Sequence, residues 1–479
     1  MTYTGPTDLH IAGSWHPAAS GARFTVTDPA TGAAIAEVAD AGVTDARAAT
    51  DAAEKALPDW ARRPPRERAE VLRRVFESMT AHRDDLAELI VRENGKPLAD
   101  ARGEVAYAAE FFRWYSEEAV RAPGSLGLSP SGERRIMTVS RPVGVSLLIT
   151  PWNLPAAMVA RKVAPALAAG CTVVLKPSFH TPLVALRLAE LVTEAGVPAG
   201  AVNVVPTTDD ILVVGDLLER EPVRMLSFTG STRVGSALLA QAAARIVNCS
   251  MELGGNAPFV VCRDADLEAA VSGALVAKFR GSAQVCIAAN RFLVHEDRVE
   301  EFTARMVEHT AALPVGNGMD PDTRIGPLIS GAAVEAARSR VRAAVGDGAR
   351  VLTPRREVPS DGHFLNPVVL GGVSPHAAIL REELFAPVVP IIAFRDDAEA
   401  VRLANDTDLG LASYVYSADL ARALRIGEAL ETGMVGINTG VLSDPAAPFG
   451  GVKQSGIGRE GGHHGMAEFL ETRYLAVDW

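Results

Sequence analysis

The sequence predicts an α/β protein with a doubly wound, Rossmann-like parallel sheet, a second α/β domain and a small β part. From residue 143 onward, short apolar runs of strand type alternate with helical stretches, the pattern of a parallel sheet with crossover helices. The chain has 479 residues, which is too many for one ordinary core, so two large domains are expected.

The N-terminal part of the chain shows other patterns. Up to residue 39, glycine and proline punctuate short alternating runs, which predicts β-hairpins. From Thr44 to about Ser116, apolar side chains such as Val71, Leu72 and Val75 recur at helical spacing. This segment is therefore expected to be helical.

The alternating region begins with a strand and an apolar helix. The helix is expected over 156–169, with Pro155 at its first turn and Gly170 just past its end. Thr181 is expected to cap a second helix that contains Pro182. The strands expected in this region are 143–150, 172–176, 202–205, 225–228 and 246–250.

A second alternating block begins near Asn256 and includes strands at 292–294 and 388–394. The tail, 468–479, is predicted to be a strand that follows the glycine-rich segment 450–465. No internal repeat or low-complexity linker separates the blocks, so the two domains are expected to pack tightly together.

Composition and charge exclude several classes of protein. The formal net charge of −11 gives no long-range attraction to nucleic acid or anionic membranes, so neither is an expected partner. Apolar stretches are interrupted before they could span a bilayer, and the polar N-terminus does not resemble a signal peptide. Four cysteines without a CxxC pair are typical of a reducing compartment, and a cytoplasmic protein is expected.

Three side chains stand where chemistry is plausible, although each also has an ordinary interpretation. Cys286 lies among small and polar residues and could be a nucleophile, but isolated cysteines are more often small buried hydrophobes. Asn153 follows a strand and could donate to an oxyanion, or only stabilise a turn. Glu252 ends another strand and could be a general base, or simply be solvated.

Two further segments suggest a dinucleotide. Lys176 and Ser178 end a strand, where a cation and a hydroxyl could meet ribose or phosphate. Residues 228–235 form a strand, a tight glycine turn and a helix start, and helix N-termini attract phosphate. The usual GxGxxG is absent. The adjacent pair His463 and His464 is expected to be solvated loop residues, and no metal site is expected.

Together these segments resemble the aldehyde dehydrogenase superfamily over essentially the whole chain. The matching strings are Thr150-Pro151-Trp152-Asn153, Lys176-Pro177, Phe228-Thr229-Gly230-Ser231, Met251-Glu252-Leu253-Gly254-Gly255, Gln284-Val285-Cys286, Glu382-Glu383-Leu384-Phe385 and Pro448-Phe449-Gly450-Gly451. Within the superfamily, the runs 153–163 and 278–280 look most like succinate-semialdehyde dehydrogenases.

The resemblance implies a role for each matched position. Cys286 would be the nucleophile, Asn153 and the Cys286 N–H the oxyanion hole, and Glu252 the base that activates the deacylating water. Hydride would pass to NAD or NADP. The positions that would bind this cofactor are Thr150, Trp152, Lys176, Ser178, Gly230, Ser231, Leu253, Glu383 and Phe385.

The resemblance also implies a clamp for a substrate carboxylate, formed by Arg161, Arg280 and Ser443. Two guanidinium groups would hold the carboxylate by charge-assisted bonds and orient the distal aldehyde. The expected substrate is succinic semialdehyde or a close analogue. The alternatives are an uncharged or aromatic aldehyde, with the arginines being ordinary solvated helix residues, and a non-catalytic relative that serves as a structural or binding protein.

Some positions depart from the pattern of the superfamily. Ala283 and Ala386 replace glycines, which would cost strain if those positions need a positive φ. Gly281 replaces a frequent asparagine, and Ala288 removes the second cysteine of a redox switch. Phe179 stands where NAD-preferring relatives carry a glutamate, which favours NADP or dual use.

The resemblance also implies an organisation for the whole chain. Residues 1–120 and 143–253 would form the cofactor domain, and 254–452 the catalytic domain. Residues 121–142 and 468–479 would supply the oligomerisation strands of a homodimer or homotetramer, because pairing across subunits protects exposed strand edges.

Overall fold

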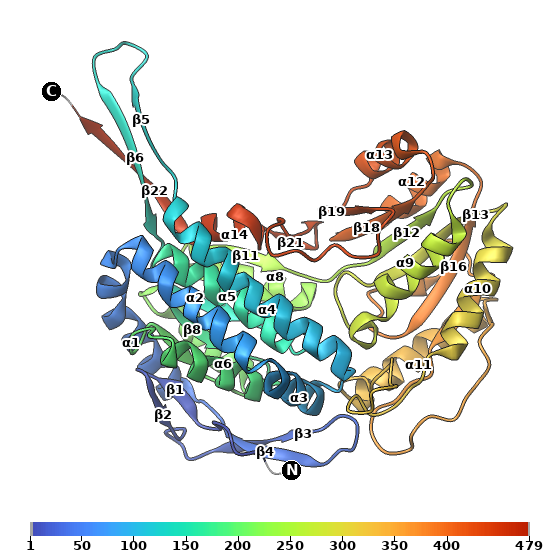
Figure 1. Ribbon diagram of the computed structural model, residues 1–479, viewed down its shortest axis with the longest axis horizontal. Coiled ribbons are helices and arrows are strands. Elements are labelled where there is room, and N and C mark those ends of the chain that lie inside the picture. Colours follow the sequence, from blue (N-terminus) through green and yellow to red (C-terminus); the bar gives the residue numbers. More distant parts are fainter. Residues whose placement is uncertain (1–2, 478–479) are drawn as a thin grey trace.

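The computed structural model describes residues 3–477 and begins with two hairpins at one end of the molecule (Figure 1). Strands β1 (Leu9–Ile11) and β2 (Ser14–His16) pair antiparallel, as do β3 (Arg23–Thr27) and β4 (Ala34–Ala39). The expected hairpins are confirmed. In the turn between β1 and β2, Gly13 adopts a φ of 78°, a conformation that side chains disfavour.

Four helices follow, as the periodicity predicts. They are α1 (Val43–Arg62), α2 (Pro65–Ala81), α3 (Arg83–Asn94) and α4 (Leu98–Glu118). The repeating apolar residues of α2, among them Val71, Leu72 and Val75, are buried against the rest of the molecule. The amphipathic stripe therefore stabilises the helix through tertiary packing.

The first sheet contains eight strands in the order β2-β1-β9-β8-β7-β10-β11-β21, in which β21 is the short strand Gly456–Ile457. Its parallel strands are β7 (Val145–Ile149), β8 (Thr172–Lys176), β9 (Val202–Val204), β10 (Val223–Thr229) and β11 (Asn248–Glu252). Across the sheet these five strands lie in the order β9-β8-β7-β10-β11, which is the doubly wound arrangement. The direction of winding reverses between β7 and β10, where such sheets bind ligands.

Helices cover both faces of this sheet. They are α5 (Pro155–Ala169), α6 (Pro182–Glu194), α7 (Asp210–Glu219) and α8 (Thr232–Ala243). Leu148 and Val173 pack into a core with α2, α4, α5 and α6, whereas Leu147 and Val174 pack on the opposite face with α1, α7 and α8. Burial on both faces explains why these strands read as continuous apolar runs.

Two local predictions are wrong. The strand expected at 246–250 spans Asn248–Glu252 instead, because Ile246 turns with a φ of 55° and is 89% exposed. Thr181 precedes α6 but its hydroxyl does not cap the helix. The free N–H groups of Leu183 and Val184 donate to the carboxylate of Glu93, from α3, at 2.9 and 3.0 Å. A distant residue replaces the local cap.

The second sheet has seven strands in the order β14-β15-β16-β13-β12-β18-β19. Its strands are β12 (Ala257–Val261), β13 (Ala289–His295), β14 (Arg350–Val351), β15 (Val368–Gly371), β16 (Val388–Phe394), β18 (Ala412–Tyr416) and β19 (Met434–Ile437). Its helices are α9 (Leu267–Phe279), α10 (Val299–Ala312), α11 (Gly331–Gly346), α12 (Asp397–Asn405) and α13 (Leu420–Ala429). The strands expected at 292–294 and 388–394 lie in β13 and β16.

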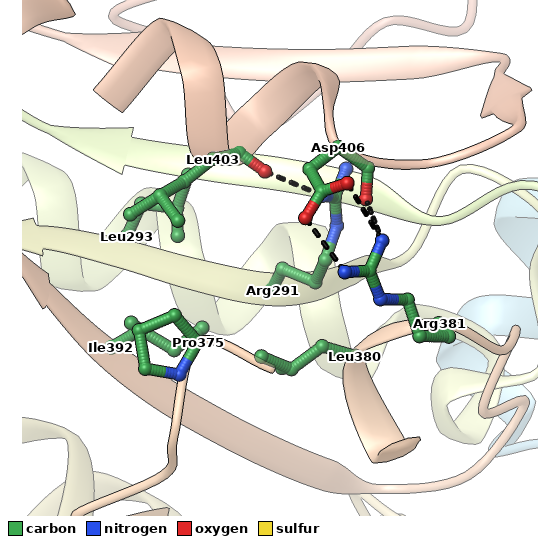
Figure 2. A pocket seen from close by; sticks show the side chains of 8 residues that line it. All are labelled: Arg291, Leu293, Pro375, Leu380, Arg381, Ile392, Leu403 and Asp406. Atoms are coloured by element: carbon green, nitrogen blue, oxygen red, sulfur yellow. Dashed lines mark hydrogen bonds and ion pairs between the residues drawn. The ribbon is translucent and has the colours of Figure 1, made fainter. Parts of the chain in front are cut away.

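A buried arginine on β13, Arg291, bonds to the Leu403 carbonyl oxygen of α12 (Figure 2). The Arg291 guanidinium, on β13, donates to the carbonyl oxygens of Asn256, Leu403 and Ala404 at 3.0, 3.0 and 2.8 Å. Burial lowers the pKa of Arg291 to about 10. Asn256 is the last residue of the segment that connects β11 to β12. Its bond to Arg291 therefore holds the chain where it passes from the first sheet to the second.

A three-stranded sheet projects from the body of the molecule (Figure 1). Strand β6 (Arg135–Pro142) lies between β5 (Gly124–Leu128) and β22 (Leu470–Val477). The two segments expected to supply oligomerisation strands therefore pair with each other, although residues 478–479 of the expected tail lie outside the described residues. The expected tail begins with a turn at residues 468–469, directly after the short helix α14 (Gly462–Ala467), and β22 starts only at Leu470. Within residues 3–477, no helix has the length and apolarity needed to cross a bilayer.

Candidate active site

Cys286 lies in a loop that enters through an unusual left-handed turn. After α9, residues Gly281, Ser282 and Ala283 all have positive φ, at 59°, 57° and 65°. Tertiary bonds hold this turn: Gly281 N donates to Asp100 Oδ2 at 2.8 Å, and Gly326 N donates to Ser282 Oγ at 2.8 Å. The local sequence disfavours this turn, so tertiary hydrogen bonds hold it in place. The turn in this way orients the residues that follow it.

The two alanines that replace glycines fall in different conformations. Ala283 occupies the left-handed region with its methyl group fully buried, at a conformational cost of about 1 kcal/mol. Ala386 does not have a positive φ; its neighbour Phe385 does, at 47°. Alanine is therefore strained at the first position only.

Asn153 joins the end of β7 to this loop. Its side-chain nitrogen donates to the backbone oxygen of Gln284 at 2.9 Å, and Ile329 N donates to the side-chain oxygen of Gln284 at 3.0 Å. The Asn153 amide keeps a second hydrogen for another acceptor. The expected oxyanion donor is thus held two residues from Cys286 along the loop.

Sequence reasoning missed the groups that hold Asn153. Lys96 Nζ donates to the Asn153 carbonyl oxygen at 2.7 Å and forms a buried ion pair with Glu104. The Glu104 carboxylate also accepts the Ala156 N–H at the start of α5, at 2.8 Å. Asn94 Nδ2 donates to the Trp152 oxygen at 3.0 Å. These residues lie in the predicted helical region, and no local motif marks them.

The Cys286 thiol is partly buried, and its pKa is raised to about 12. Burial is the largest cause, followed by the carboxylate of Glu383; Glu252 adds to the increase. The guanidinium of Arg161 opposes them. These surroundings therefore favour the protonated thiol over the thiolate.

Glu252, the last residue of β11, is buried with neither carboxyl oxygen hydrogen-bonded to a described residue. Burial raises its pKa well above the ordinary value, and Glu460 raises it further, whereas Arg161 and Lys162 lower it. An unpartnered buried carboxyl that is readily protonated is suited to accept a proton from water.

Glu460 is a second buried carboxylate that the sequence did not single out. It precedes α14 and pairs with Lys162 Nζ at 2.6 Å and with Arg161 Nη1 at 3.5 Å. Lys162 also donates to Ser227 Oγ at 2.8 Å. Glu460 lies within the glycine-rich segment 450–465, and nothing in that pattern assigns a role to its carboxylate.

The expected carboxylate clamp lines the same pocket as the thiol. The pocket encloses about 420 Å³, part of it open to solvent, and its lining residues are Leu154, Met158, Arg161, Val276, Ala277, Arg280, Val285, Cys286, Ile287, Tyr414, Gly440, Ser443 and Phe449. Arg161, Arg280 and Ser443 come from three distant parts of the chain, and the fold brings them together.

The two arginines differ in their surroundings. Arg161 is only 2% exposed; its Nη2 donates to the Tyr107 hydroxyl at 2.6 Å, and its guanidinium lies 4.1 Å from the Phe449 ring centroid. The interpretation of Arg161 as a solvated helix residue is therefore wrong. Arg280 is partly exposed to the pocket and forms no ion pair with any residue of 3–477.

A second, larger cleft opens beside the first sheet. It has about 1910 Å³ of space, including open solvent, and its lining residues include Ser231, Thr232, Gly254, Arg340, Glu383 and Lys453. Ser231 caps α8 by accepting the Val234 N–H at 3.4 Å. The N-terminus of α8 suits the negative charge of a pyrophosphate, whereas Arg340 and Lys453 are already paired with Glu382 and Glu431.

Of the other expected cofactor residues, Glu383 borders this cleft. Glu383 accepts the Gly255 N–H at 3.0 Å, and burial raises its pKa to about 7. The rings of Trp152 and Phe385 meet edge to face at 5.8 Å. A Cβ at Gly235 would lie 2.4 Å from Leu253, so glycine there lets Leu253 pack against α8.

Thr150, Lys176 and Ser178 cluster at the carboxyl ends of β7 and β8. Thr150 N donates to the Lys176 oxygen at 3.2 Å. Ser178 Oγ accepts the His180 N–H at 3.3 Å, while Lys176 Nζ pairs with Asp210 Oδ1 at 2.6 Å. Asp210 is a partner that no sequence pattern indicated.

Gly230 and the histidine pair complete the expected positions. Gly230 N donates to the backbone oxygen of Glu252 at 3.0 Å, and a Cβ on Gly230 would come within 2.4 Å of the Phe228 ring. The turn that leads into α8 therefore requires glycine. His463 and His464 belong to helix α14, not to a loop, and His463 contacts Glu118.

Comparisons with known proteins agree with this geometry. A model described as the aldehyde dehydrogenase family matches residues 15–475. A glutarate-semialdehyde dehydrogenase of Pseudomonas putida is 47% identical over 468 residues, 98% of this chain and 97% of that protein. A succinate-semialdehyde dehydrogenase of Paenarthrobacter nicotinovorans is 50% identical over 443 residues, 92% of this chain and 98% of that protein. The crystal structure of an NADP-dependent enzyme of E. coli superposes with a TM-score of 0.98 at 45% identity, covering 99% of this chain and 98% of that one.

Proposed function

The chain belongs to the aldehyde dehydrogenase family, and from this premise we propose that it oxidises a carboxylate-bearing aldehyde, succinic semialdehyde or a close analogue such as glutaric semialdehyde, with NAD or NADP. The observation that carries the proposal is the single pocket lined by Cys286, Arg161, Arg280 and Ser443. The relatives named for succinate and glutarate semialdehydes support the same substrate class.

In the proposed mechanism, Arg161, Arg280 and Ser443 bind the carboxylate and place the aldehyde carbon at Cys286. The Cys286 sulfur attacks this carbon, after its proton leaves to Glu252 or solvent. The Asn153 amide and the Cys286 N–H stabilise the oxyanion. A bound nicotinamide would supply the hydride acceptor, and loss of hydride from the hemithioacetal would leave a thioester on Cys286.

Hydrolysis of the thioester then falls to Glu252. Its carboxyl has no competing hydrogen bond from a described residue, so it is available to take a proton from the attacking water. Arg161 and Lys162 favour the ionised form of Glu252, whereas Glu460 opposes it. We assign Glu460 and Lys162 to setting the charge state of the base.

The cleft beside the first sheet fits a dinucleotide. The capped N-terminus of α8 would hold the pyrophosphate, with Gly230 and Ser231 nearest to it. Lys176 and Ser178 would meet the adenosine ribose, and Thr150, Trp152, Leu253, Glu383 and Phe385 the nicotinamide end. The E. coli neighbour named for NADP supports use of the phosphorylated form as well as NAD.

We propose that the chain divides as its family resemblance implies, into a cofactor domain (1–120 and 143–253), a catalytic domain (254–452) and oligomerisation strands (121–142 and 468–479). The exposed edges of the projecting sheet favour pairing between copies in a homodimer or homotetramer. The four free thiols favour the cytoplasm as the compartment.

The test follows formation of reduced nicotinamide with succinic semialdehyde and with butanal. Arg280→Gln should lower kcat/KM for the semialdehyde by about 30-fold or more, because a charge-assisted contact is lost, and leave butanal nearly unchanged. Arg305→Gln, which alters a partly exposed arginine on α10, serves as the matched control. Equal use of both aldehydes by the unaltered chain would contradict the clamp and favour an uncharged substrate.

A further inference from the structure

Lys176, expected to meet the adenosine ribose, already has an anionic partner. Its Nζ lies 2.6 Å from Oδ1 of Asp210, the first residue of α7. The two side chains differ in exposure, at 5% for Lys176 and 48% for Asp210. The carboxylate is therefore presented at the surface of the sheet edge, with the ammonium group beneath it.

The position of Asp210 follows from the sheet topology. Strands β8 and β9 are parallel neighbours, and α7 follows β9, so the start of α7 lies near the carboxyl end of β8. Ligands of doubly wound sheets bind at this edge. A carboxylate from a segment 34 residues away thus stands at the ribose end of the expected cofactor site.

We propose that Asp210 is a specificity-determining residue that shifts cofactor preference toward NAD and against NADP. A carboxylate at this position accepts a bond from a ribose 2′-hydroxyl, which NAD has. A 2′-phosphate would meet the same carboxylate as a like charge and would compete with it for Lys176. The inference rests on the proposed function, because it assumes that a nicotinamide dinucleotide binds at this edge.

Apart from Lys176, the groups around Asp210 add little positive charge. Phe179, at the position where NAD-preferring relatives carry a glutamate, packs against His180 with ring centroids 4.2 Å apart. Burial lowers the pKa of His180, so this ring adds little positive charge at neutral pH. Asp209 Oδ1 accepts the Leu212 N–H at 3.2 Å and caps α7. The missing carboxylate at Phe179 is thus supplied by another element.

The test measures equilibrium binding of NAD⁺ and NADP⁺ by isothermal titration calorimetry, without aldehyde. In Asp210→Asn, the ratio of the Kd for NADP⁺ to the Kd for NAD⁺ should fall by about tenfold or more, since the like charge is removed and Lys176 is released. Asp209→Asn removes a charge from the adjacent residue without the Lys176 contact, and should change the ratio less than about twofold. Circular dichroism checks that both variants are folded.

Two results would overturn the inference in distinguishable ways. A ratio in Asp210→Asn equal to that of Asp209→Asn, with both dinucleotides still bound, would remove the role of Asp210 and leave the proposed function intact. Failure of the unaltered chain to bind either dinucleotide would remove the proposed function and this inference with it.

Discussion

The substrate pocket and the cofactor cleft differ in how they handle charge. Arg161, which lines the pocket, and its neighbours Glu252 and Glu460 are buried, and burial is the main cause of the raised pKa values of Glu252 and Cys286. The cleft is lined by the N-terminus of α8 and by partly exposed pairs such as Arg340–Glu382. The pocket therefore governs proton transfer, whereas the cleft governs recognition of a charged ligand.

This contrast teaches which changes to expect from substitutions. A buried group without a hydrogen-bond partner has little redundancy, so its loss should remove one chemical step. A backbone-built phosphate site should tolerate the loss of a pocket side chain. Substitutions in the pocket are therefore expected to separate catalysis from dinucleotide binding.

The largest effect is expected for Cys286→Ala. Without the sulfur no thioester forms, so aldehyde oxidation should fall by at least about 10⁴-fold. The Kd for the dinucleotide should stay within about threefold of the original value, because the cleft is built by other elements. Steady-state kinetics and calorimetry measure the two quantities. Substantial remaining oxidation would contradict the role of Cys286 and break the division between the regions.

A smaller effect is expected for Glu252→Gln. Thioester formation should continue while hydrolysis slows, so rapid mixing should show a burst of one reduced nicotinamide per site and turnover lowered by about 100-fold. In the unaltered chain, turnover should rise with pH, because the raised pKa of Glu252 keeps the base protonated at low pH. Normal turnover in the variant would mean that another group activates the water.

The smallest effect is expected at Glu383, which lines the cofactor cleft. Its pKa is raised from 4.5 to about 7, mainly by burial. The folded state therefore holds this proton more tightly than the unfolded state, and the associated stability is present below pH 4.5 and lost as the pH rises through 7. Glu383→Gln should remove this pH-dependent loss of unfolding free energy, which amounts to about 2 kcal/mol between pH 5 and pH 8.

Urea unfolding at pH 5 and pH 8 measures the change in free energy. The neighbouring Glu382, which is exposed and pairs with Arg340 at 2.8 Å, supplies the matched control Glu382→Gln. The same pH dependence in Glu383→Gln and in the unaltered chain would show that Glu383 is not the group responsible.

Sequence alone predicted much of the fold because its strongest signals are local. Continuous apolar runs fixed the parallel strands, and Pro155 with Gly170 marked the ends of α5 as observed. The cap of α6 was predicted wrongly, because Glu93 from α3 replaces Thr181. Local patterns do not reveal a cap that arrives from another helix.

The candidate site shows the same division. Sequence motifs identified Cys286, Glu252 and Asn153 as candidate catalytic residues and placed them at strand ends or in a loop. The family resemblance added Arg161, Arg280 and Ser443. The structure supplied the partners: Lys96 for Asn153, Glu460 for Arg161 and Lys162, and Asp210 for Lys176. These partners come from distant segments, so no spacing in the sequence connects them to the motifs.

By itself, then, the sequence determined the alternation of strands and helices and the side chains available for chemistry, since periodicity and residue type are properties of short segments. Tertiary structure decided the charge state of those side chains. Whether a carboxyl or thiol is ionised depends on burial and on charges a few ångströms away, and folding alone brings such groups together.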